Sequence, residues 1–516
     1  MKRFSTILLI LHVFLFTSLH SQDLSEAKEH FNNGNFLSAI ISYRLHLADH
    51  PDDKNALKNI GLCYLNSNID KSKSIRYFKK CLAFEKYDKE ILYYLALAYS
   101  YNLDFEKALE FLRLYELKPG RYKKEIPILF ERFNFAQTQI SSPKNVEIEN
   151  LGDKVNTSIE ETNPFIAKKE RILVFSSTRK GNKGIADIFG NFYSDIYTNN
   201  FTGFNFSRSK NCKSLNGNFH DECTGIKDDG SYIYVTVKHP SFRQQLDVFK
   251  SKKRGRVYKR KELLNQGLNS LKFNESSGTF NVDENIIFFS SDRPGGLGGN
   301  DIYIMKKLPN GQWGEAENLY AINSALNEEY PYFNSFDSCL YFSSNGLPGI
   351  GQYDLFKTKL NIEENVWSDP ENLGFPINSP YDEKTICFSR KNKHAYISSL
   401  RKGGLGNYDI YRVIYNDVTL KPVIFLMSVK EDSTLKSIDS VEIEINSTQT
   451  NVIYGKYLPN KNNGLFTVAI DPGKYQLKIS SPTHQTLLKK FNVSNFDYDK
   501  EIIRQTHLLK PKTNDP

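Results

Sequence analysis

The sequence predicts a multidomain chain: an all-α helical repeat, then an all-β propeller of five blades, then a small all-β sandwich. Three observations indicate this order. Residues 23–141 carry apolar residues at helical spacing, residues 145–415 repeat one strand–turn–strand pattern five times, and residues 418–510 form a separate series of short apolar strands. A length of 516 residues is ample for several domains. Residues 511–516 are expected to be a tail.

Residues 1–21 have the composition of a secretory signal peptide. Lys2 and Arg3 precede the apolar run Ile7–Phe16, and small and polar residues follow up to an expected cleavage site near Ser21. The alternative is an uncleaved N-terminal anchor, although the run is short for a bilayer span of about 20 residues. Because no later segment is a long uninterrupted apolar run, we expect an exported protein with no transmembrane span after signal cleavage.

The helical region repeats with a period of about 34 residues, the length of a tetratricopeptide repeat. Small residues, which allow paired helices to approach, recur at this spacing at Ala39, Ser74 and Ala108. The region resembles about three tetratricopeptide repeats, closed by a capping helix over 122–140. Such a stack predicts a concave surface for a protein partner, and a rigid spacer is the alternative.

The β region is organised around Ile286–Tyr303, which has the pattern of a strand, a glycine-rich hairpin and a second strand. The second strand of each copy opens with an aspartate, at Asp195, Asp247, Asp301, Asp354 and Asp409. We interpret these aspartates as structural residues of the blade motif, whose carboxylates accept hydrogen bonds from loop amides. Calcium binding is a weaker alternative, because other residues replace the first loop carboxylate in two copies.

A second repeated element lies between the hairpins and has the form Asn-Leu-Gly, then Ile-Asn-Ser, then two acids. One copy, which begins at Asn150-Leu151-Gly152, precedes the first hairpin, and none follows the last. We therefore expect the segment before the first hairpin to complete the last blade, so that the ring closes and its sheet edges are protected. Six blades are the alternative, because a diverged unit could lie within 178–245.

Several motifs resemble known families. Ser-Ser-x-Arg, Gly-Gly-x-Gly, Asp-Ile-Tyr and Ile-Asn-Ser resemble the PD40 (WD40-like, TolB-type) propeller repeats of Bacteroidota envelope proteins. Gly464-Leu465-Phe466 and Asp471–Tyr475 resemble the carboxypeptidase regulatory-like (transthyretin-like) β-sandwich. The domain order is similar to that of PorE-like proteins of the type IX secretion and gliding apparatus, without their OmpA-like C-terminal domain. This resemblance implies a protein of the periplasm or of the outer-membrane periphery.

No motif indicates catalysis, a cofactor or a metal. The glycine-rich hairpin lacks the Gly-Lys-Ser/Thr of a phosphate-binding loop, the histidines lack metal-ligand spacing, and no G-x-S-x-G element is present. We interpret the paired acids between the hairpins as structural. Among six cysteines, Cys212 and Cys223 share one predicted loop and are the candidate disulfide pair, since export permits disulfides.

Two groups of basic residues are candidate contacts for an anionic ligand or partner. Arg179, Arg293 and Arg401 recur at one blade position, and the favoured interpretation is that each pairs with the repeated aspartate. The densest charge run, in a chain of net charge +9, consists of Lys252, Lys253, Arg254 and Arg256. Such a run is usually a solvated hairpin, and an acidic glycan, lipid head group or acidic protein is the functional alternative.

These observations favour a non-enzymatic scaffold whose partners are other envelope proteins, in an outer-membrane complex. A propeller that binds a glycan or a peptide is the first alternative. A hydrolase that uses the ring centre is the second, and it would require inward-facing acids and a histidine to converge there. An exported protein is not expected to bind nucleic acid.

Overall fold

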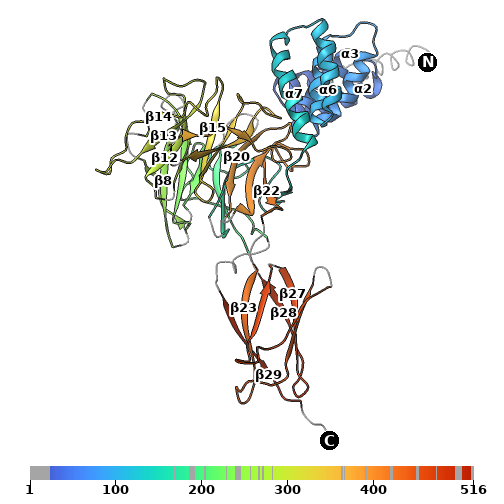
Figure 1. Cartoon of the computed structure of the whole chain (residues 1–516). Coiled ribbons are helices and arrows are strands. Elements are labelled where there is room, and N and C mark those ends of the chain that lie inside the picture. Colours follow the sequence, from blue (N-terminus) through green and yellow to red (C-terminus); the bar gives the residue numbers. More distant parts are fainter. Residues whose placement is uncertain are drawn as a thin grey trace, which may run out of the picture.

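The computed structural model describes residues 24–167, 170–184, 192–202, 205–227, 229–238, 246–255, 257–264, 268–269, 272–281, 283–361, 364, 366–389, 392–418, 422–448, 452–471, 473–493 and 502–512. The expected signal peptide, residues 1–21, lies outside this described part, as do Arg256 and Pro472. Figure 1 shows three regions in sequence order: helices, a ring of sheets, and a β domain on the side of the ring opposite the helices.

The helical region begins with helical residues 24–32. The elements that follow are α2 (Phe36–Asp49), α3 (Lys54–Asn66), η1 (Lys71–Lys73), α4 (Ser74–Leu82), α5 (Glu90–Tyr101), α6 (Phe105–Leu117), η2 (Lys123–Glu125) and α7 (Ile126–Ser141). Asp53 caps α3, because its Oδ1 accepts from the amides of Asn55 at 2.9 Å and Ala56 at 3.0 Å. Among the described residues, no helix is long and apolar enough to cross a membrane.

Successive helices from α2 to α7 contact one another and pack around small residues. Ala39, Ser74 and Ala108 are each 0% exposed. At Gly61 of α3, an added Cβ would lie 2.5 Å from the ring of Phe78 on α4, so this pair of helices packs directly against the glycine. The recurring small residues therefore lie in the core of the stack, where helices approach most closely.

The described residues between 146 and 415 form five antiparallel sheets. The first is β2 (Glu161–Ile166), β3 (Ile172–Ser177), β4 (Asp195–Asn200) and β5 (Lys210–Asn211). The second is β6 (Asp221–Ile226), β7 (Tyr232–Lys238), β8 (Leu246–Arg254), β9 (Val257–Tyr258) and β10 (Glu262–Leu263). The third is β11 (Glu275–Phe280), β12 (Ile286–Ser291), β13 (Asp301–Lys306) and β14 (Glu317–Asn318).

The fourth sheet is β15 (Glu328–Asn334), β16 (Cys339–Ser344), β17 (Asp354–Asn361), β18 (Val366–Trp367) and β19 (Glu371–Asn372). The fifth is β20 (Glu383–Phe388), β21 (His394–Ser399), β22 (Asp409–Tyr415) and β1 (Val146–Asn150). The innermost strands of the five sheets are β2, β6, β11, β15 and β20. These innermost strands contact one another in a closed cycle, β2 with β6, β6 with β11, β11 with β15, β15 with β20 and β20 with β2. This cyclic order is that of a β-propeller.

The fifth sheet takes strands from both ends of the β region. β1 pairs antiparallel with β22, so that Val146 lies opposite Tyr415 and Asn150 opposite Tyr411. This is the pairing that the displaced copy at Asn150–Gly152 predicts. It covers the edge of β22, which would otherwise present unpaired backbone groups.

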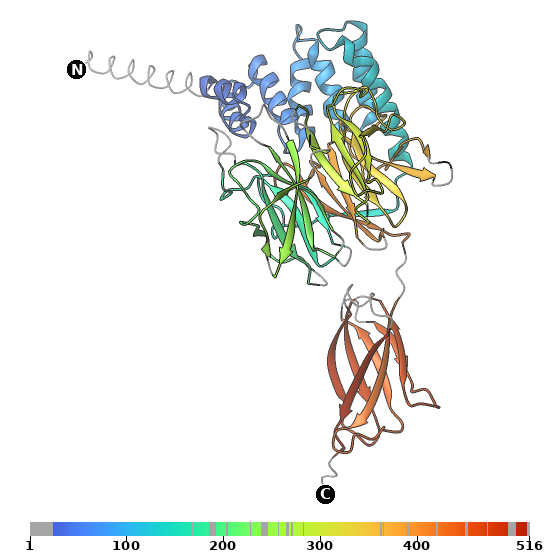
Figure 2. The same ribbon diagram turned by 90° about the vertical axis from the view of Figure 1, so that its left-hand side faces the viewer.

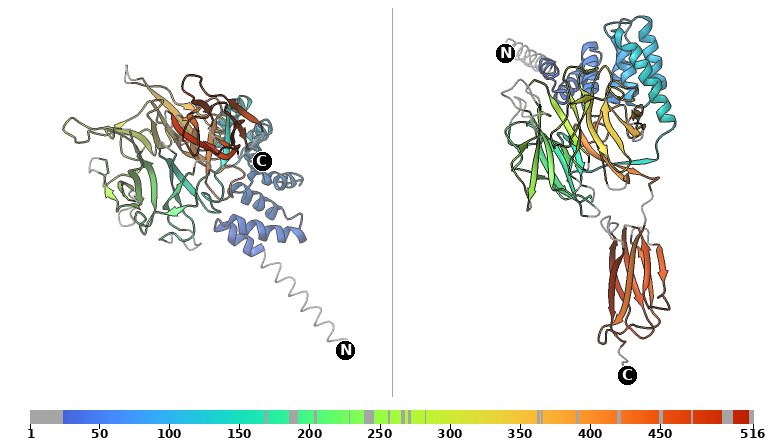
Figure 3. Two further views of the ribbon diagram at one scale, coloured as in Figure 1. Left: turned by 90° about the horizontal axis from the view of Figure 1, so that it is seen from below. Right: turned by 60° about the vertical axis from the view of Figure 1, so that its left-hand side comes forward.

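The C-terminal region contains two further sheets. One has the order β26 (Phe466–Ile470), β23 (Val423–Glu431), β29 (Ile503–Leu509), and the other β25 (Ile453–Tyr457), β24 (Glu442–Ser447), β27 (Gly473–Ser480), β28 (Leu487–Val493). Burial alternates along β26 and β27, which gives each sheet one apolar face. These faces share a core that includes Phe425, Val468 and Leu477. Figure 2 and the right-hand view of Figure 3 show this domain away from the helices.

Candidate functional site

The innermost strand of each sheet opens with a buried acid. These acids, each 0% exposed, are Glu161, Asp221, Glu275, Glu328 and Glu383. In three sheets an arginine pairs with the acid, and the pairs are Arg179–Glu161 (3.0 Å), Arg293–Glu275 (2.9 Å) and Arg401–Glu383 (3.0 Å). In the second sheet Lys261 supplies the cation to Asp221.

The expectation that these arginines pair with the hairpin aspartate is therefore wrong. Ser291 and Glu275 face each other across neighbouring strands, and Arg293 follows Ser291 by two residues, so it reaches the glutamate directly. Arg293 also donates to Ser291 Oγ at 3.2 Å and to the Leu268 carbonyl oxygen at 3.3 Å. Its side chain is only 15% exposed, which leaves little of the guanidinium available to an anionic ligand.

The hairpin aspartate instead holds the loop above its own strand. Asp354 accepts from the amides of Ile350 at 2.6 Å and Gly351 at 2.8 Å. Asp301 and Asp409 accept from the equivalent amides in their loops, while Asp195 accepts from the side chain of Asn211. Asp247 is half-buried at the start of β8. In three of the loops the carboxylate is thus bonded to N–H donors, the arrangement expected of a structural residue.

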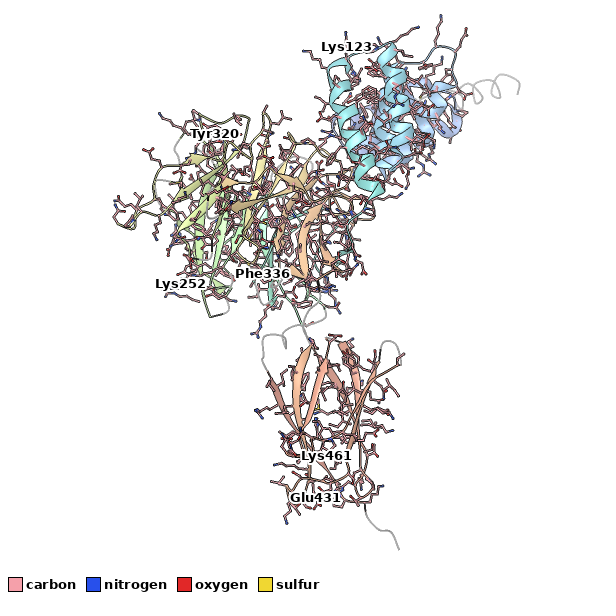
Figure 4. All side chains as sticks on the ribbon, in the orientation of Figure 1. Lys123, Lys252, Tyr320, Phe336, Glu431 and Lys461 are labelled. Atoms are coloured by element: carbon pink, nitrogen blue, oxygen red, sulfur yellow. The ribbon has the colours of Figure 1, made fainter. Side chains whose placement is uncertain are left out.

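The basic run lies along β8 and its turn. Lys252 lies 5.6 Å from the ring centroid of Tyr232, and Lys253 lies 5.5 Å from that of Tyr258. Figure 4 places Lys252 at the end of the ring away from the helices. A role for Lys252, Lys253 and Arg254 in binding a partner therefore stays a prediction, and it concerns a surface distant from the helical stack.

Cys212 and Cys223 are both free thiols in the structure, as are the other four cysteines. Cys223 is buried in β6 and Cys212 packs against the same apolar cluster. Burial raises the pKa of the Cys212 thiol to about 11, so the reactive thiolate is disfavoured. The predicted disulfide is not formed here.

The helical stack rests on one end of the ring, which we call the hairpin face. This face consists of the hairpin loops 293–300, 345–353 and 400–408 with the linkers 157–160, 322–327 and 377–382. The ring centroids of Tyr101 and Tyr381 are 5.0 Å apart, and Ile350, 2% exposed, belongs to the same apolar cluster as the helices. The Lys402 ammonium lies 2.9 Å from the Asp70 carboxylate. Helices and ring are thus joined by apolar and polar contacts.

A groove of about 760 Å³ opens where the first helices meet the last hairpin loop. One wall comes from the segment before α2 and the α3–η1 connection, and the other comes from 402–407. Five asparagines line it: Asn33, Asn35, Asn66, Asn68 and Asn407. Phe36, Leu37 and Leu405 add apolar surface. Because a side-chain amide both donates and accepts, this lining suits the main chain of an extended peptide.

The inner rim of the hairpin face gathers acids and tyrosines from several sheets, together with Lys384. The residues are Glu160, Glu222, Glu329, Asp382, Tyr330, Tyr353 and Tyr408. Burial, reinforced by the neighbouring Glu222 carboxylate, raises the pKa of Glu160 to about 7. The Tyr408 hydroxyl donates to Asp382 at 3.3 Å, and the Lys384 ammonium lies 4.8 Å from the Tyr353 ring centroid.

His220 occupies the position equivalent to Glu160 in the next linker. Its Nδ1 accepts from the amide of Ser194 at 3.1 Å, and its ring lies 4.7 Å from that of Tyr193. The acids of the rim thus face the ring centre, whereas His220 contacts Tyr193 and Ser194 of the hairpin in the first sheet.

Sequence reasoning did not identify the groove or the acidic rim. It also did not identify the contact of the helices with Ile350 and Tyr381. The equivalents of Ile350 are 51% and 49% exposed (Leu297 and Leu405), and one equivalent of Tyr381, Leu326, is 50% exposed. An aromatic residue beside Pro380 was the available signal. The rim residues lie in linkers, strands and hairpin loops of different sheets, and only ring closure brings them together.

No protein-family profile and no curated protein matches the sequence. Among solved structures, the chain is similar to TolB from Acinetobacter baumannii, with 11% identity, a TM-score of 0.29, and coverage of 50% of this chain and 55% of that protein. It is also similar to a putative TolB from Agrobacterium tumefaciens, with 12% identity, a TM-score of 0.31, and coverage of 70% and 92%. A third similar structure is a thermostable family-43 glycoside hydrolase, with 12% identity, a TM-score of 0.35, and coverage of 50% and 91%. Likenesses at these TM-scores support no statement about function.

Proposed function

We propose that this chain is a non-enzymatic scaffold that binds other envelope proteins at an outer-membrane complex. In this proposal residues 23–141 are tetratricopeptide-like repeats, 145–415 are a five-bladed PD40-type propeller, and 418–510 are a carboxypeptidase regulatory-like sandwich. The five sheets and the cyclic contacts of their innermost strands support the propeller. The placement in a type IX secretion or gliding complex rests on the resemblance in domain order alone.

The groove between the helices and the last hairpin carries the proposal. Its walls belong to two regions that the Tyr101–Tyr381 contact holds together, so the groove depends on their relative placement. Asn68 donates to the side-chain oxygen of Asn407 across the groove, while Asn33, Asn35 and Asn66 offer donors and acceptors for a peptide main chain. Leu37 and Leu405, 56% and 49% exposed, offer apolar contacts beside them. Extended segments are bound by this combination of main-chain hydrogen bonds and side-chain contacts.

Affinity purification of the full chain from the native envelope tests the proposal. Wild-type protein should bring down other envelope proteins, and the double variant Leu37→Asp/Leu405→Asp should reduce their recovery by about tenfold, the size of effect expected at a central contact. Val366→Asp is the matched control, because Val366 is also exposed (55%) but lies on β18. Recovery of the wild-type protein alone after chemical crosslinking would contradict the proposal.

A glycan-binding or hydrolytic site at the ring centre is a second candidate, and one observation favours it. The raised pKa of Glu160 keeps part of this carboxyl group protonated at neutral pH, which is the state that a general acid requires. A glycan array, followed by assays with chromogenic glycosides, tests this candidate. Binding or turnover that Glu160→Gln abolishes would favour it over the scaffold.

A further inference from the structure

The hairpin face carries three equivalent pairs of apolar residues. Each pair consists of the residue between two glycines of a hairpin loop and a residue of the linker that this loop approaches. This is the next linker along the chain for Leu297/Leu326 and Ile350/Tyr381, and the first linker for Leu405/Ile159. In all three pairs the backbone of the hairpin loop closely approaches the backbone of the linker. A Cβ added to Gly298, Gly351 or Gly406 would lie 1.9, 2.0 or 2.5 Å from the carbonyl oxygen of Leu326, Tyr381 or Ile159, respectively.

The three pairs differ in what covers them. The helical stack buries the middle pair, leaving Ile350 2% and Tyr381 6% exposed. Leu405 lies at the edge of the stack and lines the groove. At the third position Leu297 and Leu326 are 51% and 50% exposed. Beside them Tyr320, 58% exposed, donates its hydroxyl to the Gly295 carbonyl oxygen at 2.8 Å, and Figure 4 shows Tyr320 toward the helical end of the ring.

We propose that Leu297, Leu326 and Tyr320 form a second helix-docking site, which receives an α-helical segment of a partner protein. The site repeats the geometry at which this chain's own helices dock, and it belongs to the neighbouring sheet, so it continues an interface already formed. A helix end that presents an aromatic or long aliphatic side chain fits this position, as Tyr101 at the end of α5 fits Tyr381. This inference rests on the proposed scaffold function and specifies one partner surface.

The chemistry of the partner helix should differ from that of this chain's own helices in one respect. At the covered position the linker carries Asp382. Burial lowers the pKa of Lys71 on η1 to about 8, and the Asp382 carboxylate opposes this shift by attracting the ammonium. At the open position the equivalent residue is Asn327, whose Oδ1 accepts from the amide of Asn300 at 3.0 Å. An uncharged amide offers a lysine no ion pair, so the partner helix is expected to be apolar and uncharged where it meets Leu326.

Site-specific photocrosslinking in the native envelope tests the site. With p-benzoylphenylalanine in place of Leu326, mass spectrometry should locate an adduct in an amphipathic helical segment of another protein, next to an aromatic or aliphatic residue. The same probe in place of Tyr381 should react with this chain's own helices and serves as the positive control. No adduct at position 326, an adduct only with a second copy of this chain, or an adduct only with a glycan would each overturn the proposal.

A variant pair separates this site from the groove. Leu297→Asp/Leu326→Asp should lower recovery of the crosslinked partner by about tenfold and leave the melting temperature unchanged. The control Val366→Asp should leave the recovery of the partner unchanged. If Leu37→Asp/Leu405→Asp loses partners while Leu297→Asp/Leu326→Asp retains all of them, the scaffold function stands and this site is wrong. If the wild-type chain recovers no partner, both proposals fall.

Discussion

At the residue scale, the structural core of each repeat is a buried acid held at the start of the innermost strand. Glu275 is 0% exposed and is satisfied by Arg293 and by the Ser291 hydroxyl. A buried carboxylate costs much free energy unless it is paired and hydrogen-bonded. The recurring arginine and serine of the hairpin motif therefore stabilise the sheet by satisfying this acid.

Removal of one member of this pair should be more harmful than removal of both. Arg293→Met leaves Glu275 buried without its cation, which should lower the free energy of unfolding by about 3–5 kcal/mol. Arg293→Met/Glu275→Gln removes both charges and should restore a large part of that loss. Lys58→Met is the control, because Lys58 and its partner Asp88 are 30% and 38% exposed. Denaturant unfolding measures all three, and equal destabilisation by the single and double variants would contradict the pairing.

The acidic rim predicts a pH dependence that Glu160 controls. Its folded-state pKa of about 7 lies above the 4.5 of an unperturbed glutamate, so folding favours the protonated form. The contribution of the protonated Glu160 to the free energy of unfolding is fully present below about pH 4.5 and is lost as the pH rises through about 7. Glu160→Gln should therefore raise the melting temperature more at about pH 8 than at about pH 5. A difference in melting temperature between the two proteins that is the same at both pH values would contradict the prediction.

At the element scale, one asparagine of the first linker adds to the pairing of β1 with β22 that closes the β region. Asn156, 1% exposed, accepts from the Ile410 amide at 2.9 Å and donates to the Ile410 carbonyl oxygen at 3.0 Å. It thus bonds the first linker to β22, which lies at the far end of the β region. Asn323 makes the same two contacts to Ile302 within the third sheet.

This equivalence gives a matched pair of variants. Asn156→Ala should leave the Ile410 amide unsatisfied, at a cost of about 1–3 kcal/mol, while the Ile410 carbonyl oxygen keeps its bond from the Leu151 amide at 3.2 Å. The variant should accelerate hydrogen exchange in β1 and β22. Asn323→Ala should accelerate exchange in β13 and leave β1 unchanged. Rapid exchange of β1 in both variants, or in neither, would show that Asn156 does not secure the closing strand.

At the scale of the whole molecule, the docking of the helices on the hairpin face creates the groove. In this interface the ring centroids of Tyr101 and Tyr381 are 5.0 Å apart, whereas Lys402, which pairs with Asp70, is 60% exposed. Exposed ion pairs contribute about 0–1 kcal/mol, while buried aromatic contacts contribute more. The aromatic contact is therefore expected to hold the two regions together.

Solution scattering can separate these two contributions. Tyr101→Asp should release the helices from the ring, which would increase the radius of gyration and remove the groove. Lys402→Ala should leave the radius of gyration unchanged. An unchanged radius of gyration in Tyr101→Asp, with the helices still folded by circular dichroism, would show that other contacts hold the stack.

The sequence by itself determined the local and repeated features of this protein. Helical spacing with recurring small residues predicted the helices, because a small residue is required wherever two helices approach. The alternating and glycine-rich patterns predicted the hairpins, and the displaced motif at Asn150–Gly152 predicted the partner of the last strand. These features depend on neighbouring residues or on a repeat that the sequence displays, so they can be recognised without coordinates.

Only the tertiary structure decided which repeats the helices cover and which acid each arginine pairs with. Arg293 was assigned to the wrong acid, because both candidate acids recur with the same period and only strand register distinguishes them. Leu326 and Tyr381 occupy the same position in the repeat, yet one is half exposed and the other buried. The physical reason is that burial depends on the path of distant helices over the ring, and a repeated sequence motif carries no information about that path.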